Sequence, residues 1–220
     1  MDEQKLQLLI TKDGSHSLRN DWLEETYHSV HGAMTESKHV FINAGLHYFP
    51  FEKKINLLEI GFGTGLNVLL TLLEEEYDVH YHSLEAYPLE KIIYSQLNYH
   101  LHLNVAREKF LQVHECEWGR EAELGKNFIL LKQRTKMESV NFTEKYYDLI
   151  YFDAFAPRVQ PELWTKEIFE KIFRSMKDGG VLVTYCAKGE VKRNLKAAGF
   201  EVETLQGPPG KREMTRAIKK

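Results

Sequence analysis

The pattern of hydrophobic and polar positions changes near residue 50. From Lys53 onward, short apolar runs alternate with longer segments whose apolar residues recur at helical spacing. The short runs predict strands and the longer segments predict helices. Seven strands are expected, at residues 55–60, 79–84, 128–131, 147–152, 181–185, 200–205 and 214–218. The main helices are expected at residues 66–76, 88–99, 161–176 and 191–198.

This alternation predicts a parallel sheet with helices on both faces. The last two strands follow each other without a helix between them, so they must form a hairpin, and the final strand runs antiparallel to the rest. The expected fold class is α/β, with a mostly parallel seven-stranded sheet, a C-terminal antiparallel hairpin and a small N-terminal extension. The arrangement resembles that of Rossmann-like class I methyltransferases; a classical dinucleotide dehydrogenase does not end this way.

Residues 1–50 have a pattern of their own. A strand is expected at residues 4–11, a turn signal at Asp13-Gly14 indicates a hairpin or sharp reversal, and a helix is expected at residues 24–32. We therefore expect an N-terminal extension, residues 1–50, packing on a larger domain, residues 51–220.

A glycine-rich segment joins the strand at residues 55–60 to the helix that follows it. Glycines at 61, 63 and 65 allow a sharp turn and the close approach of a ligand. The spacing is not G-x-G-x-x-G, whose third glycine serves close packing behind a pyrophosphate. Glu85 ends the next strand about twenty residues later, where a carboxylate holds ribose hydroxyls. S-adenosyl-L-methionine, which has no pyrophosphate, fits this loop better than NAD. The alternative for the glycine loop is a strand–helix turn that binds no ligand, and the alternative for Glu85 is a solvated strand end.

An acidic segment, Asp153-Ala-Phe155-Ala-Pro157, follows the strand at residues 147–152. The carboxyl ends of parallel strands line the ligand crevice, so Asp153 is expected on the same edge as the glycine loop. Its carboxylate can orient an amine, and Phe155 can stack on a planar ring. Alternatively, Asp153 caps the next turn and Phe155 belongs to the core.

Five sequence blocks together resemble one family. They are Asp13-Gly-Ser15, Glu36-Ser37 with Val40-Phe41, Leu58-Glu-Ile-Gly-Phe-Gly-Thr-Gly-Leu-Asn67, Asp153-Ala-Phe-Ala-Pro157, and Pro161-Glu-Leu-Trp164. The family is the MnmC-type methyltransferases, which methylate the aminomethyl group on the wobble uridine of certain tRNAs. The resemblance covers nearly the whole chain.

The resemblance implies a site and partners. The cofactor, S-adenosyl-L-methionine, is expected to bind at Glu59, Gly61, Phe62, Gly63, Gly65, Leu66, Asn67 and Glu85. Asp153 is the expected catalytic residue, and Glu36, Phe155 and Pro157 are expected to contact the substrate. The macromolecular partner is tRNA. The 220 residues leave no room for the flavin-dependent domain of the bifunctional members, so we expect a stand-alone methyltransferase and a separate upstream enzyme that supplies the aminomethyl uridine.

The sequence departs from such folds at one place. Many of them carry an acid just after the third strand to hold the adenine amino group, and this chain has Leu130-Leu-Lys-Gln133 there. No adenine contact is assigned at that position.

The expected reaction is attack of a primary amine on the sulfonium methyl, with positioning as the main source of acceleration. A carboxylate with an ordinary pKa of about 4 is a poor base for an alkylamine. We therefore expect Asp153 to orient the amine, with proton loss to solvent.

Composition excludes several classes of protein. Only Cys116 and Cys186 are present, so no disulfide framework or four-cysteine metal site is expected. The pairs His80/His82 and His100/His102 lack a third ligand cluster, so no metal is expected. No apolar run is long enough to span a membrane and no signal peptide is evident, so a cytoplasmic protein is expected.

The charge is unevenly distributed. The chain has a formal net charge of −3, yet residues 188–220 hold nine Lys or Arg and four Glu, a net of +5. This basic C-terminal segment can contact phosphates, although a solvated charged face explains it equally well.

Three other functions remain open from the sequence. A small-molecule methyltransferase would use the same cofactor without tRNA, and a nicotinamide dehydrogenase would bind NAD instead. A non-catalytic cofactor-binding module would bind S-adenosyl-L-methionine and methylate nothing.

Overall fold

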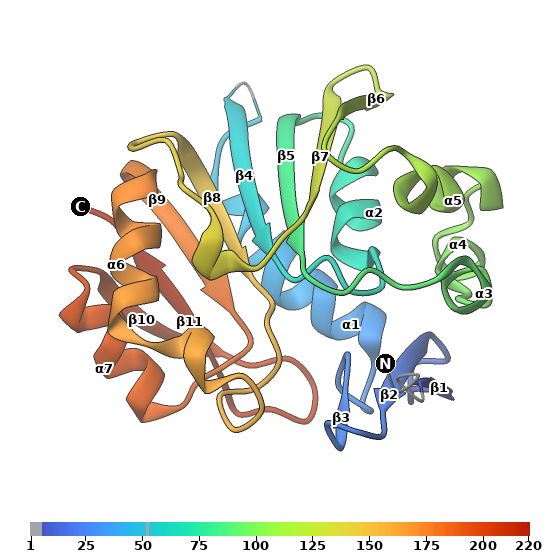
Figure 1. The fold of residues 1–220 in the computed structure, drawn as a ribbon, viewed down its shortest axis with the longest axis horizontal. Coiled ribbons are helices and arrows are strands. Elements are labelled where there is room, and N and C mark those ends of the chain that lie inside the picture. Colours follow the sequence, from blue (N-terminus) through green and yellow to red (C-terminus); the bar gives the residue numbers. More distant parts are fainter. Residues whose placement is uncertain (1–5, 52) are drawn as a thin grey trace.

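A computed structural model of the chain describes residues 6–51 and 53–220. Its centre is an eight-stranded sheet in the order β10-β11-β9-β8-β4-β5-β7-β6 (Figure 1). The strands are β4 (Lys54–Ile60), β5 (Asp78–Glu85), β6 (Glu121–Gly125), β7 (Phe128–Arg134), β8 (Tyr147–Phe152), β9 (Met176–Thr184), β10 (Glu201–Gln206) and β11 (Glu213–Ile218).

The seven expected strands are all present. Strands β4, β5, β7, β8 and β9 pair in parallel. Strand β11 runs antiparallel to both β9 and β10, which confirms the C-terminal hairpin.

The expected count of seven is one strand short, because β6 pairs antiparallel with β7 at the edge of the sheet. Glu121 and Glu123 are exposed on it and alternate with the half-buried Ala122 and Leu124. Such a short, acidic edge strand carries little hydrophobic signal, which is why the pattern along the sequence missed it.

Alternation along the strands separates two cores. Leu57, Tyr151 and Val183 face one core, which also contains residues of α2 (Leu66–Leu72) and α5 (Arg107–Glu115). Ile150 and Leu182, the sequence neighbours of Tyr151 and Val183, face the other core with α6 (Lys166–Ser175) and α7 (Gly189–Ala197). Because successive side chains point to opposite faces of a strand, both faces of the central strands are buried.

Three of the four expected helices are shorter than the pattern predicts, whereas α7 begins two residues earlier than expected. Within the range expected to be helical, 88–99, only α3 (Lys91–Tyr94) and the first residue of α4 (Tyr99–Leu103) are helical, and α5 after them was not predicted. The segment expected to be helical at 161–176 begins with a 3₁₀ turn, η4 (Pro161–Trp164). Thr165 then caps α6, because its Oγ1 accepts a hydrogen bond from the Ile168 amide.

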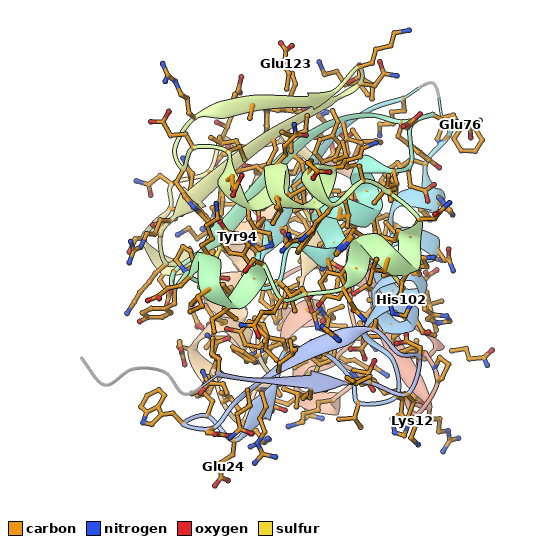
Figure 2. All side chains as sticks on the ribbon, turned by 90° about the vertical axis from the view of Figure 1, so that its right-hand side faces the viewer. Lys12, Glu24, Glu76, Tyr94, His102 and Glu123 are labelled. Carbon is orange, nitrogen blue, oxygen red and sulfur yellow. The ribbon has the colours of Figure 1, made fainter. Side chains whose placement is uncertain are left out.

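The N-terminal extension begins with a three-stranded antiparallel sheet of β1 (Leu6–Ile10), β2 (His16–Asn20) and β3 (Glu25–Thr26). The hairpin at Asp13-Gly14 is confirmed by the pairing of β1 with β2. Residues 4 and 5 of the predicted first strand lie outside the described residues. Figure 2 shows this hairpin beneath the helices, with His102 of α4 above it. His102 Nε2 lies 3.0 Å from the Gly14 carbonyl oxygen.

The prediction of a helix at residues 24–32 is wrong. That segment holds β3 and turns, and Glu24 has a left-handed backbone with φ of 48°. The helix begins later, with α1 (Ala33–Ser37), and continues as the π-helix η1 (Lys38–Asn43), followed by the 3₁₀ turn η2 (Leu46–Tyr48). Asp13 explains the late start, because its Oδ2 accepts hydrogen bonds from the Thr35 amide and hydroxyl in the first turn of α1.

The extension and the sheet share one core. Buried side chains of α1 and η1, such as Met34 and Phe41, belong to the same cluster as those of α2 and β4. The boundary at residue 50 stays a prediction. No helix of the described residues is long and apolar enough to cross a membrane.

Candidate active site

The glycine loop, residues 61–65, lies where β4 ends, between the ends of β5 and β8 (Figure 1). Gly61, Gly63 and Gly65 have φ of +96°, +50° and +70°, a region that glycine adopts without strain. A Cβ on Gly61 would lie 2.6 Å from the Asp153 carbonyl oxygen, and one on Gly65 would lie 2.9 Å from His114 Nε2. The loop therefore needs glycine for both its conformation and its packing.

Glu85 is held against this loop. Its Oε2 accepts a hydrogen bond of 3.0 Å from the Gly63 amide, and its Oε1 accepts one of 2.9 Å from the Tyr87 amide. The carboxylate thus fixes the loop in addition to the ribose contact expected of it.

Two loop residues that were predicted to contact the cofactor turn their side chains inward. The Phe62 ring is buried against His114 and Trp118, with ring centroids 5.1 and 5.5 Å away. Leu66 is also buried in the core. Any cofactor contact from these two residues therefore comes from their backbones.

Glu59 lies beneath the loop and is fully buried. Its Oε2 accepts a hydrogen bond of 2.5 Å from the Ser83 hydroxyl. Burial raises the pKa of Glu59 to about 8, and the nearby charge of Asp153 adds to the rise. The Asn67 and Tyr81 side chains approach Glu59 closely enough to act on its pKa. Even so, Glu59 Oε1, Asn67 Oδ1 and the Tyr81 hydroxyl are among the buried polar atoms of the described residues that make no well-formed hydrogen bond. Such atoms are rare in proteins, and here they leave hydrogen-bonding capacity for a polar ligand next to the loop.

Asp153 is on the same edge as the loop, as predicted. Its amide donates a 3.0 Å hydrogen bond to the Ile60 carbonyl, and its Oδ2 accepts one of 2.9 Å from Asn67 Nδ2. Burial raises the pKa of Asp153 to about 7, and the charge of Glu36 contributes to the rise. The expectation of an ordinary pKa for this carboxyl is therefore wrong, because the sequence did not show how far the strand end is desolvated.

Phe155 and Pro157 lie in the loop that follows, and both are partly exposed. The Phe155 ring packs edge-on against Tyr27, with ring centroids 5.0 Å apart. Its backbone is fixed on both sides, because its amide donates to Gln160 Oε1 and its carbonyl accepts from Trp164 Nε1, each at 2.9 Å. Phe155 is thus a rim residue rather than a member of the buried core.

Tyr27 was not singled out in the sequence. Its ring lies 3.3 Å from where a Cβ on Gly63 would be, so it covers the glycine loop. Burial, with the charge of Glu85 added, raises the pKa of Tyr27 above its usual value. No sequence pattern marks this tyrosine, because it reaches the loop from the turn after β3.

Glu36 joins the site through a second group of residues. Its Oε1 accepts a 2.9 Å hydrogen bond from the Ser29 amide, and its Oε2 lies 2.6 Å from Lys211 Nζ. The Lys211 ammonium also lies over the Tyr185 ring, 4.1 Å from its centroid. The Tyr185 hydroxyl donates to the Ala154 carbonyl at 2.9 Å, next to Asp153. Lys211 and Tyr185 were missed as site residues; the Gly207-Pro-Pro-Gly210 turn was the available signal for Lys211.

The end of β7 carries a buried lysine where many related folds have an acid. Lys132 Nζ donates a 2.6 Å hydrogen bond to the His114 carbonyl and lies 4.6 Å from the centroid of the Trp118 ring. Desolvation lowers its pKa. Its ammonium is therefore already engaged in internal contacts.

Both histidines of the first pair have hydrogen-bond partners within the fold. His80 Nδ1 lies 2.9 Å from the Tyr146 hydroxyl, and His82 Nδ1 lies 2.6 Å from the Tyr147 hydroxyl. Within residues 6–51 and 53–220, no three His, Cys, Asp or Glu side chains are grouped to hold a metal ion.

The sequence model of one protein family, described as S-adenosyl-L-methionine-dependent methyltransferase, matches residues 97–220. The chain belongs to this family. This methyltransferase therefore uses S-adenosyl-L-methionine as its cofactor, and the unpaired polar atoms beneath the glycine loop fit a polar ligand at that edge. Membership in this family also removes the nicotinamide dehydrogenase from the open alternatives.

Two curated relatives are tRNA 5-methylaminomethyl-2-thiouridine biosynthesis bifunctional proteins MnmC. The methyltransferase is 30% identical over 208 residues to that of Cupriavidus necator, covering 87% of this chain and 31% of the relative. It is 28% identical over 211 residues to that of Leptospira interrogans, covering 89% and 32%. The chain thus spans about a third of the length of these relatives.

Solved structures agree with the fold. MNMC2 from Aquifex aeolicus is 27% identical, with a TM-score of 0.78 over 100% of this chain and 72% of that one. Spermidine synthase from Thermotoga maritima, at 16% identity and a TM-score of 0.55 over 100% and 70% of the two chains, shares the fold alone.

Proposed function

We propose that this methyltransferase transfers a methyl group to the primary amine of a 5-aminomethyl group on the wobble uridine of tRNA, giving 5-methylaminomethyl(-2-thio)uridine. The observation that carries the proposal is Asp153, a half-buried carboxyl with a raised pKa, which accepts a hydrogen bond from Asn67 at the sheet edge that bears the glycine loop. The names of the relatives support the substrate, because they describe the biosynthesis of that nucleoside.

The cofactor side of the proposal rests on the glycine loop and the acids around it. Glu59, Gly61, Gly63, Asn67 and Glu85 would hold S-adenosyl-L-methionine, together with the backbones of Phe62 and Leu66. The cofactor bears a sulfonium and an ammonium group, and the Glu85 carboxylate would favour such a cation, whereas Glu59, with its pKa raised to about 8, is mostly protonated at neutral pH. The bound cofactor supplies an electrophilic methyl group.

The acceptor side rests on Asp153. A carboxyl with a pKa raised to about 7 is a better base than the sequence led us to expect, and it is matched to neutral pH. We therefore assign Asp153 the proton from the substrate ammonium. The neutral amine, oriented by Asp153, would then accept the methyl group that the cofactor supplies. Phe155 and Pro157 at the rim would contact the uridine ring.

The tRNA side rests on charge at the C-terminal end of the chain. Several basic residues of 188–220 are engaged within the protein, since Lys192, Lys211, Arg216 and Lys220 form ion pairs and Lys219 donates to backbone carbonyls. Lys188, Arg193, Lys196 and Arg212 are exposed and form no ion pair with another described residue. Lys188 follows β9 and Arg212 lies in the β10–β11 loop beside Lys211, so these two are nearest the site and would contact tRNA phosphates.

The decisive experiment incubates the protein with labelled S-adenosyl-L-methionine and tRNA from cells that lack this activity, followed by nucleoside analysis. Label should appear in the wobble uridine. The control is tRNA without the aminomethyl group, which should remain unlabelled. Labelling of a small amine but of no tRNA would favour the small-molecule alternative, and cofactor binding without any transfer would favour the non-catalytic module.

A further inference from the structure

The ion pair between Lys211 and Glu36 joins two segments that are far apart in the sequence. Glu36 comes from α1 of the N-terminal extension, whereas Lys211 comes from the β10–β11 loop. Glu36 is only 6% exposed, so its carboxylate depends on the few partners that reach it. Those partners are the Ser29 amide and the Lys211 ammonium.

This ion pair lies beside Asp153. Tyr185 connects the two groups, because its ring lies under the Lys211 ammonium and its hydroxyl bonds to the Ala154 carbonyl. The titratable groups whose charges act on Asp153, or which respond to its charge, come from five parts of the fold. They are Glu36 of α1, Glu59 of β4, Tyr81 of β5, Tyr185 after β9, and Lys211 of the β10–β11 loop.

Lys211 is the one cation in that set, and Glu36 is the anion it contacts. The structure assigns to Lys211 the role of a positioning residue, which holds the Glu36 carboxylate in place and balances the negative charge that faces Asp153. The assignment rests on the proposed function of Asp153 as the residue that receives the amine proton. It extends that function to a residue that need not touch the substrate.

The role of Lys211 predicts the direction in which the pKa of Asp153 moves in each variant. Without Lys211, the buried Glu36 carboxylate would face Asp153 uncompensated, and the pKa of Asp153 would rise. Without the charge of Glu36, the pKa of Asp153 would fall, because a like charge is removed and the lysine remains. A purely structural ion pair would lose stability in both variants without opposite shifts in the titration of Asp153.

The experiment compares Lys211→Met, Glu36→Gln and the double variant with the unsubstituted protein. The titration of Asp153 is followed by NMR of ¹³C-labelled aspartate carboxyls, with the Asp153 resonance assigned by its absence in Asp153→Asn. The midpoint should move up by about one pH unit in Lys211→Met and down by a similar amount in Glu36→Gln. In the double variant it should return toward the original value. Arg212→Met, which removes the same charge from the adjacent residue, should leave the midpoint unchanged.

The pH midpoint of single-turnover methyl transfer should move in the same direction as the NMR midpoint in each variant. In Lys211→Arg, which keeps the positive charge, it should stay near that of the unsubstituted protein. Shifts of the same sign in both single variants, or a shift in Arg212→Met equal to that in Lys211→Met, would overturn the assignment. Glu36→Gln removes a buried charge rather than stranding one, so its downward shift remains a test if Lys211→Met does not fold. Because the NMR titration needs no substrate, the assignment of Lys211 can hold even if no tRNA is methylated. Conversely, methylation of tRNA without the opposite shifts would refute the assignment of Lys211 and leave the proposed function standing.

Discussion

The proposed cofactor half of the site, residues 59–67 with Glu85, comes from one strand–loop–helix segment and the end of the neighbouring strand. The proposed acceptor half comes from α1, the end of β8, the end of β9 and the β10–β11 loop, and it comprises Glu36, Asp153, Phe155, Tyr185 and Lys211. The first half is fixed by backbone conformation and by the hydrogen bond that the Gly63 amide donates to Glu85. The second is fixed by ion pairing and ring contacts between distant segments.

This difference separates two functions within one sheet edge. The glycine loop takes its shape mainly from its own glycines and Glu85, although Tyr27 of the N-terminal extension covers it. The acceptor half is complete only when the extension and the C-terminal hairpin are both docked. If these assignments hold, as we propose, the choice of methyl acceptor would depend on long-range packing, whereas cofactor binding would depend mainly on the loop and its immediate neighbours.

Asp153→Asn should have the largest effect on methyl transfer, and this effect should be confined to the acceptor half of the site. The amide keeps the shape of the side chain and can still accept the hydrogen bond from Asn67, but it cannot take a proton. We expect methyl transfer to fall by about 10²- to 10⁴-fold, the usual contribution of a positioned proton acceptor. Calorimetric titration should show nearly unchanged affinity for S-adenosyl-L-methionine. Full activity in this variant would remove Asp153 from the mechanism.

Gly65→Ala should give the opposite outcome. Its Cβ would lie 2.9 Å from His114 Nε2 in a backbone with φ of +70°. We expect cofactor affinity to fall by roughly tenfold or more, because strain at such a position is of order 1–3 kcal/mol. Transfer at saturating cofactor should be largely retained. Gly179→Ala is the matched control, since Gly179 has φ of +78° but nothing within 4 Å of the added Cβ. If both substitutions weaken cofactor binding equally, the effect is not specific to the loop.

The rate of methyl transfer should rise with pH through the titration of Asp153. Its pKa is raised to about 7, so the ionised fraction increases by roughly tenfold between pH 6 and pH 8. Single-turnover rates at saturating cofactor would show this rise. In Asp153→Asn the inflection near pH 7 should disappear, leaving only the dependence on the amine itself. An inflection that persists in the variant would belong to another group.

The contrast between the two halves also explains what the sequence predicted. The glycine loop, Glu85 and Asp153 were correctly located because each marks the end of a strand, and a parallel sheet brings those ends to one edge. Tyr27, Tyr185 and Lys211 were missed because they meet only after distant segments pack. The raised pKa of Asp153 was missed for the same reason, since its desolvation is a property of the assembled fold.

The errors in the fold have local causes. Residues 24–32 were expected to be helical, but Asp13, from the neighbouring hairpin, caps a helix that starts at Ala33. Strand β6 was missed because an exposed edge strand needs no apolar run. These features depend on pairing and capping partners that a hydrophobic pattern does not record.

Neutralising Lys188 and Arg212 together should weaken tRNA binding by a few-fold and leave cofactor binding unchanged. Both residues are exposed and form no ion pair with another described residue. Removing a side chain that binds one phosphate should reduce the slope of log K against log salt by about one. Binding measured at several salt concentrations tests this. Replacing Lys126, an exposed lysine in the β6–β7 turn at the far edge of the sheet, is the control.

Asp153→Asn should also change stability, by the smallest effect of the series. An unfolded aspartate has a pKa of about 3.9, whereas burial raises the pKa of Asp153 to about 7 in the folded protein. The folded state therefore binds more protons between about pH 4 and pH 7, and this carboxyl makes the protein less stable as pH rises through that window. Asparagine does not titrate, so the difference in melting temperature between Asp153→Asn and the unsubstituted protein should grow in favour of the variant from pH 5 to pH 8, by a few degrees. Glu59 is present in both proteins, so its own titration contributes to both curves. A difference that stays constant across this range would mean that Asp153 is not desolvated, and the acceptor half would then lose its main electrostatic distinction from the cofactor half.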